Sequence, residues 1–170
     1  MKKIIPVFLC AFLVISCSAC SNKADAVDLN RLYSVSAEIS IDDFTTSAVL
    51  SRLGNGAWDL SFTAPENING LTVTYLNETA EISYKGLSFS IPNEEIPASA
   101  IAEALTKSLD NAAFSAEVEF TEKNGKIKAK GKISDNEYEL SIDKKSGAVL
   151  SLEIPDINFE ADFSDFSLMG

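Results

Sequence analysis

Apolar and polar residues alternate along most of the chain beyond Leu32. Because successive side chains of a strand point to opposite faces of a sheet, this period of two predicts strands with one buried and one solvated face. We count eleven strands, six before residue 93 and five after residue 113. The clearest run from Val35 to Ile41, Trp58 to Phe62, Ile82 to Tyr84, Leu87 to Ile91, Phe114 to Phe120, Tyr138 to Ile142 and Ile157 to Phe163.

Turn residues between these segments predict which residues face one another. Asn124-Gly125 is the strongest short hairpin signal, and Asn77-Glu78, Lys85-Gly86 and Asp135-Asn136 are further candidates. Each resulting register keeps apolar residues opposite apolar residues. The predicted pairs are Glu119 with Lys130, Glu117 with Lys132, Phe120 with Ala129, Tyr75 with Ala80, Val73 with Ile82, Ile82 with Phe89, Lys132 with Glu139, and Ile133 with Tyr138.

One segment departs from the alternation. Ile101, Leu105 and Leu109 repeat every four residues, as on one face of a helix, Pro97 suits its first turn, and Asp110-Asn111 suits its end. The predicted fold is therefore mainly β (α+β). An antiparallel meander of about eleven strands is curved into a half-barrel, and one helix is inserted after the sixth strand as a lid.

The strands carry more large inward side chains than one narrow helix can cover. The remaining apolar face must close on itself, meet a partner or hold an apolar ligand. A pocket of several hundred Å³ would suit such a ligand. The residues predicted to line it share the inward side of the first six strands or the apolar face of the helix: Trp58, Leu60, Phe62, Val73, Tyr75, Ile82, Phe89, Ile101, Leu105 and Leu109.

The first twenty residues carry a different pattern. A basic start is followed by an apolar run, Ile4 to Ile15, that is too short to span a bilayer as a mature helix. The run ends in Val14-Ile15-Ser16-Cys17, which resembles the lipobox of bacterial lipoprotein signals. This resemblance implies cleavage after Ser16 and lipid attachment to Cys17, with Cys20 as the alternative. The domain would then be tethered to the outer face of a bacterial membrane, or face the periplasm.

This reading divides the chain into a signal peptide (1–16), a lipid anchor and tether (17–31) and a single half-barrel domain (32–170). Lys2 and Lys3 leave with the signal, so the charge of the remaining 154 of 170 residues is −13 rather than −11. Such acidity argues against nucleic acid as a partner and against adhesion to an anionic membrane by charge. Membrane contact is then expected through the covalent lipid.

The residue types that the chain lacks exclude several kinds of catalytic and binding site. The chain has no histidine, and no cysteine follows Cys20. Ser-His-Asp and Cys-His catalysis are therefore absent, as are disulfides and thiolate sites in the domain. We predict no enzymatic activity, no cofactor and no metal.

A longer motif has a family resemblance. The stretch Trp58-x-Leu60-x-Phe62-x-Ala64-Pro65, followed by Gly70, Leu71, Val73 and Tyr75, is similar to the third and fourth strands of the LolA-like periplasmic lipoprotein carriers and their lipid-anchored relatives. The resemblance implies a cupped apolar face that holds acyl chains. It also implies a buried arginine, which Arg52 does not match because we expect a turn there. The anchored relatives, which receive or hold lipid-bearing cargo, are the closer comparison.

Three polar motifs have simpler explanations than a site. Ser141 and Lys144 match Ser-x-x-Lys, but that dyad needs a helical turn and here lies at a strand end. Asn158, Glu160 and Asp162 could suggest a calcium site, but alternate strand positions lie about 6.6 Å apart, too far to share one ion easily. Charges that keep a terminal edge strand from aggregating explain these residues better. A lysine row at positions 126, 128, 130 and 132 faces the predicted neighbours Glu117, Glu119, Glu139 and Asp143, as in a solvated charge ladder.

These observations predict a membrane-anchored, non-enzymatic lipoprotein. Its cupped sheet would bind a lipid, an acyl chain or another hydrophobic ligand. The alternative is an extracytoplasmic scaffold or chaperone-like lipoprotein that docks a partner protein.

Overall fold

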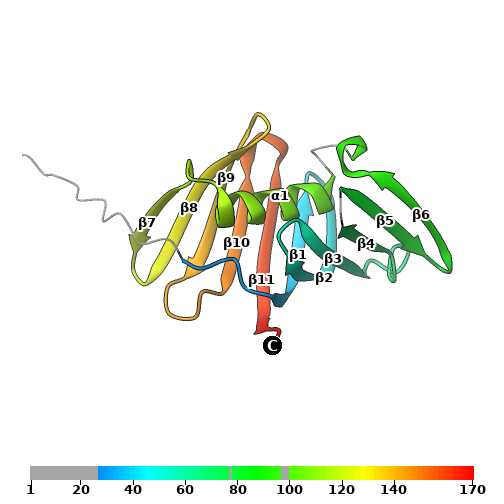
Figure 1. The fold of residues 1–170 in the computed structure, drawn as a ribbon, viewed down its shortest axis with the longest axis horizontal. Helices are drawn as coiled ribbons and strands as arrows, with labels where there is room; N and C mark the ends of the chain where they lie inside the picture. The colour runs from blue at the N-terminus through cyan, green and yellow to red at the C-terminus, as the bar shows by residue number, and fades with distance from the viewer. Residues whose placement is uncertain (1–26, 77, 97–99) are drawn as a thin grey trace, which may run out of the picture.

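The computed structural model describes residues 27–76, 78–96 and 100–170. Their eleven strands form one antiparallel sheet in the order β6-β5-β4-β3-β2-β1-β11-β10-β9-β8-β7 (Figure 1). The predicted strand number, the antiparallel pairing and a helix after the sixth strand are confirmed. The strands are β1 (Tyr33–Ile41), β2 (Phe44–Gly54), β3 (Ala57–Ala64), β4 (Thr72–Leu76), β5 (Thr79–Tyr84), β6 (Leu87–Pro92), β7 (Glu119–Lys123), β8 (Lys126–Ile133), β9 (Asn136–Asp143), β10 (Val149–Ile154) and β11 (Phe159–Leu168).

The α-helix α1 (Ile101–Phe114) links the two edges of the sheet, because β6 and β7 lie at opposite ends of the strand order. Two 3₁₀ turns, η1 (Asn93–Glu95) and η2 (Pro155–Ile157), complete the elements. At about 1.5 Å per residue α1 is about 21 Å long, the width of four or five strands. It therefore crosses one face of the sheet without covering all of it (Figure 1).

Most of the predicted register is confirmed. Glu119 faces Lys130 and Phe120 faces Ala129 across the β7–β8 hairpin. The same holds for Tyr75 with Ala80, Val73 with Ile82, and Ile82 with Phe89.

The predicted β8–β9 register is wrong by two residues. Lys132 faces Glu137, Ile133 faces Asn136, and Tyr138 faces Gly131. A shift of two keeps every side chain on its face, so apolar alternation cannot decide between the two registers. The observed one gives the bulky Tyr138 ring a glycine as its neighbour, and a Cβ on Gly131 would lie only 2.5 Å from the Tyr138 hydroxyl.

The helix is longer than predicted. It continues past Asp110-Asn111 to Phe114, so β7 begins only at Glu119. Glu117 lies in the intervening turn and does not face Lys132 in the ladder. Packing explains the extension, because Ala112 is buried and the Phe114 ring lies 5.1 Å from the guanidinium of Arg52.

The segment before β1 belongs to the folded domain from residue 27 onward. Leu29 is buried in the core. Arg31 donates a hydrogen bond of 3.0 Å from Nη2 to the carbonyl oxygen of Ser146. Cys17 and Cys20 lie outside the described residues. Within the described part of the chain, no helix is both long and apolar enough to cross a membrane.

Candidate functional site: the helix-facing side of the sheet

The structure brings eight of the ten predicted ligand residues together beneath α1 or at its contact with the sheet. Trp58 faces Tyr75 across β3 and β4, and Leu60 faces Val73. Leu105 and Leu109 are completely buried on the side of α1 that packs on the sheet, and Ile101 is half-buried. The buried sheet residues of this set are Trp58, Leu60, Phe62, Val73 and Tyr75.

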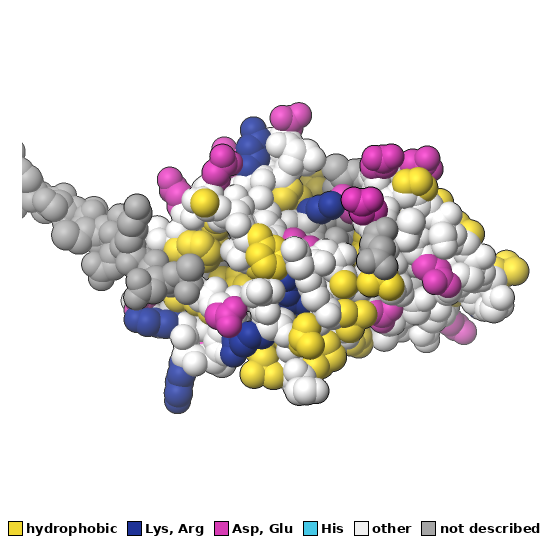
Figure 2. All heavy atoms as spheres, in the orientation of Figure 1, with side chains coloured by type: hydrophobic (Ala, Val, Ile, Leu, Met, Phe, Trp, Pro, Cys, Tyr) yellow, Lys and Arg dark blue, Asp and Glu magenta, His cyan; other side chains and the backbone are white. Residues whose placement is uncertain are grey.

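The remaining two, Ile82 and Phe89, lie at the uncovered end of the same face. Ile82 is half-buried against the core, whereas Phe89 is 57 % exposed. Sequence reasoning did not single out Leu87, which shares this face and is 77 % exposed. In Figure 2 this end of the molecule is mostly white, with apolar side chains visible only at its rim. The helix therefore covers the middle of the apolar face and leaves its β6 end open.

The cavities among the described residues have a different character from the predicted apolar pocket. Five open cavities of about 320 to 510 Å³ are lined mostly by polar and charged side chains. None of these five is lined by the predicted sheet residues, because α1 already fills the space above them. An apolar ligand would have to lie on the open β6 end or displace the helix.

An ion pair between a buried arginine and a partly buried aspartate holds α1 to the sheet. Arg52 of β2 is completely buried, and its Nη1 donates a 2.6 Å hydrogen bond to Oδ1 of Asp110. The Trp58 indole donates a 2.9 Å hydrogen bond to the other oxygen of Asp110. The Arg52 guanidinium lies 5.0 Å from the Trp58 ring and 5.1 Å from that of Phe114, distances at which cation–π attraction acts.

The expected turn at Arg52 is therefore wrong, because β2 continues to Gly54. The signal that could have predicted a buried Arg52 is its position in the alternation of buried and exposed residues. Arg52 follows Ala48 and Leu50 at steps of two, and all three are buried on the helix-facing side. Asp110, expected only at a helix end, gives this arginine its counter-charge.

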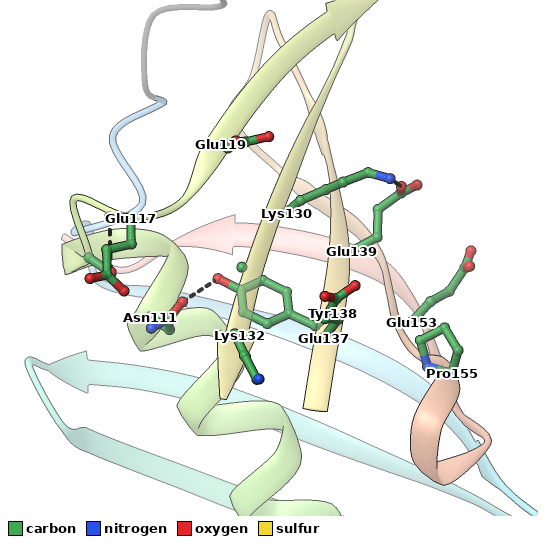
Figure 3. Close-up of a pocket in the computed structure, with 12 residues that line it drawn as sticks. Asn111, Glu117, Glu119, Lys130, Lys132, Glu137, Tyr138, Glu139, Glu153 and Pro155 are labelled. Atoms are coloured by element: carbon green, nitrogen blue, oxygen red, sulfur yellow. Dashed lines mark hydrogen bonds and ion pairs between the residues drawn. The ribbon is translucent and has the colours of Figure 1, made fainter. Parts of the chain in front are cut away.

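A second polar contact fixes the same C-terminal part of α1, one residue beyond Asp110. The Tyr138 hydroxyl of β9 and the side-chain oxygen of Asn111 are 2.8 Å apart, and Tyr138 donates (Figure 3). The ring reaches the helix by crossing over Gly131, which has no side chain to obstruct it. The cavity here, of about 450 Å³, is rimmed by charged residues such as Lys132 and Glu117.

Glu103 of α1 is a titratable group whose pKa is changed by burial. Burial raises the pKa of Glu103, although Lys107 and the Tyr75 hydroxyl each lower it in part. Burial also raises the pKa of Tyr75, so its hydroxyl stays protonated. The fold therefore favours a neutral Glu103.

Glu103→Gln is expected to stabilise the protein at pH 7 and to have little effect near pH 3. The neutral form is favoured in the fold, so the contribution of Glu103 to stability is present below its unfolded pKa of about 4.3 and is lost as the pH rises through the higher folded value. Urea unfolding at both pH values measures the difference. An equal gain at pH 3 and pH 7 would show that the carboxyl charge is not the cause.

The other face of the sheet carries charge ladders. Glu139 accepts an ion pair from Lys128 and another, at 3.0 Å, from Lys130. On the helix-facing side, Glu122 faces Ile127 and pairs with Lys144 at 2.7 Å, so Lys144 has a partner other than Ser141. Within the described residues, no three His, Cys, Asp or Glu side chains form a group that could hold a metal ion.

Comparisons with known proteins show the fold alone. No protein-family model and no curated protein matches the chain. An uncharacterized conserved protein from Thermus thermophilus has a similar structure, with a TM-score of 0.54 and 11% identity over 84% of this chain and 82% of that one. A LolA superfamily protein from Nitrosomonas europaea matches at a TM-score of 0.42 and 10% identity, over 85% and 88%. A DUF1329 family protein from Desulfovibrio piger matches at 0.37 and 13%, over 83% and 87%.

Proposed function

We propose that this protein is a membrane-anchored, extracytoplasmic lipoprotein that binds a lipid, an acyl chain or another apolar group on the helix-facing side of its sheet, without catalysing a reaction. The observation that supports this most is the apolar face that α1 leaves open. Leu87 and Phe89 are exposed there on the same side as the buried Trp58 and Leu60. Burying a large apolar side chain stabilises by about 1.5–3 kcal/mol, so an apolar ligand at this end gains affinity.

The open end leads directly to the core. Phe89 faces Ile82, Ile82 faces Val73, and Val73 faces Leu60, which gives one apolar row across β6, β5, β4 and β3. Exposure falls along this row, from 57 % at Phe89 to 7 % at Val73 and 0 % at Leu60. A chain-like ligand could lie along the row and reach the edge of α1 without entering a closed cavity.

The helix fits the role of a lid in this proposal. Leu105 and Leu109 are buried in the same core as Leu60 at the inner end of the row. Two polar contacts, Arg52–Asp110 and Asn111–Tyr138, hold α1 in place. Movement of α1 away from the sheet would lengthen the apolar surface available to a ligand. This movement would expose apolar surface of α1 and of the sheet to water. Burial of the apolar ligand against that surface would offset the cost.

A fluorescent fatty acid tests the ligand. Phe89→Ser is expected to weaken uptake by the full chain several-fold, because it breaks the exposed end of the row. Leu53→Ser is the matched control, since Leu53 is also exposed, at 48 %, but lies on the opposite face of the sheet. Mass spectrometry of an organic extract identifies lipid that co-purifies. A folded wild type that takes up no probe and releases no lipid would exclude this function.

The anchor is tested separately. Cys17→Ala is expected to release the protein from the membrane or leave it unprocessed, because Cys17 alone has the full lipobox before it. Membrane fractionation and the mass of the mature protein give the result. Loss of anchoring in Cys20→Ala, with Cys17→Ala unaffected, would move the attachment to Cys20.

A scaffold that docks a partner protein is the second candidate. The observation that favours it is the open edge of β6, where Leu87 and Phe89 are exposed beside unpaired backbone. A clean organic extract together with specific capture of one protein would support it.

A further inference from the structure

The two edges of the sheet differ in how they are protected. Open edge strands usually carry charges that prevent pairing with other chains. The edge strand β7 fits this rule with Glu119, Glu122 and Lys123 among its five residues. The other edge strand, β6, reads Leu-Ser-Phe-Ser-Ile-Pro and carries no charge. Its exposed, uncharged edge is therefore open to pairing with another strand.

The backbone groups that β6 presents outward can be identified. Lys85 and Gly86 have φ values of 49° and 84°, as in a type I′ turn, whose flanking residues Tyr84 and Leu87 form a hydrogen-bonded pair. At the other end, the Asn93 N–H donates a 3.0 Å hydrogen bond to the Glu78 carbonyl oxygen. Because hydrogen bonding alternates along an antiparallel strand, the odd-numbered residues of β6 bond inward to β5. Ser88 and Ser90 then bond outward.

The sequence of this edge is self-complementary. Leu87-Ser88-Phe89-Ser90-Ile91 reads apolar, serine, Phe, serine, apolar in both directions. In an antiparallel pair of two such strands centred on Phe89, Leu87 faces Ile91 and Ser88 faces Ser90. The outward serines form the hydrogen-bonded pairs, and the two Phe89 residues form a non-hydrogen-bonded pair, in which side chains approach most closely.

We propose that β6 of one molecule pairs antiparallel with β6 of a second copy, about a two-fold axis at Phe89. The ends of the strand support this register. Pro92 has no N–H to donate and lies just beyond the five paired residues. Each Lys85 comes to the end of the partner strand that is followed by Glu94 and Glu95, so opposite charges meet at both ends. The pairing joins the two apolar rows into one surface across both copies.

Cysteine cross-linking of the full chain tests the register. Phe89→Cys should form a disulfide dimer under mild oxidation, because residues of a non-hydrogen-bonded pair have Cα atoms about 4.5 Å apart, within disulfide reach. Leu87→Cys is the matched control. Leu87 is the more exposed residue, but in this register it lies about 13 Å along the strand from its own copy. The wild-type chain gives the background from its native cysteines.

The expected result is a dimer yield at least several-fold higher for Phe89→Cys than for Leu87→Cys on non-reducing electrophoresis. Ser90→Pro in the Phe89→Cys chain should abolish that dimer, because it removes an outward N–H from each strand. Circular dichroism shows whether this variant is folded. Equal yields at positions 87 and 89, or an undiminished dimer in a folded Ser90→Pro variant, would overturn the proposal. So would a folded Phe89→Cys chain that stays monomeric under oxidation.

Discussion

Replacing Asp110 with alanine is expected to lower the free energy of unfolding by about 3 kcal/mol or more. The Arg52 guanidinium is completely buried, and its ion pair to Asp110 is 2.6 Å long. Removing one partner of a buried pair leaves an uncompensated charge in the core, which typically destabilises by about 3–5 kcal/mol. The Trp58 indole loses its acceptor in the same substitution. Urea unfolding of the purified protein measures the change.

Two variants separate this effect from the general loss of an ion pair. Glu122→Ala removes the exposed pair with Lys144, and we expect a loss of about 1 kcal/mol or less. The double replacement Arg52→Met with Asp110→Leu removes both charges from the core, so we expect it to be more stable than Asp110→Ala. A loss for Asp110→Ala no larger than that for Glu122→Ala would show that water reaches Arg52 and replaces the carboxylate.

The local pattern of the sequence predicts the strands because it depends on neighbouring residues only. Alternation from Trp58 to Phe62 identifies the buried face of β3, and the Asn124-Gly125 turn fixes the β7–β8 register. The prediction fails where two registers place the same side chains on the same face, because alternation cannot distinguish them. The β8–β9 hairpin could shift by two without moving any side chain to the other face, and only the fit of Tyr138 over Gly131 separates the two registers.

Contacts between distant parts of the chain account for the remaining differences. The pairing of β1 with β11 joins the first and last strands, and no turn signal specifies it. The helix extends past Asp110 because Phe114 packs on Arg52, more than sixty positions earlier in the sequence. Of the ligand residues predicted from parity, those near the middle of the sheet are buried under α1. Which of them a ligand could reach depends on the length of the helix, and alternation carries no information about that length.

Leu105→Asp is expected to weaken binding of a fluorescent fatty acid several-fold. Leu105 is completely buried on the sheet-facing side of α1. An aspartate there places a carboxylate without a partner against the inner end of the apolar row, where both the fold and an acyl chain exclude water. The substitution also reduces stability, and Leu105→Ala, expected to lose about 2–5 kcal/mol, gives the part that comes from lost packing alone.

Lys107→Asp is the control for the charge itself. It places the same side chain on the same helix at a position that is 53% exposed, so we expect unchanged probe binding. Fluorescence titration gives the affinities, and circular dichroism identifies the variants that remain folded. If folded Leu105→Asp and Lys107→Asp proteins bind the probe equally well, the ligand does not reach beneath α1. We would then place binding at the open end of the row at Leu87 and Phe89, where the apolar face meets solvent without movement of the helix.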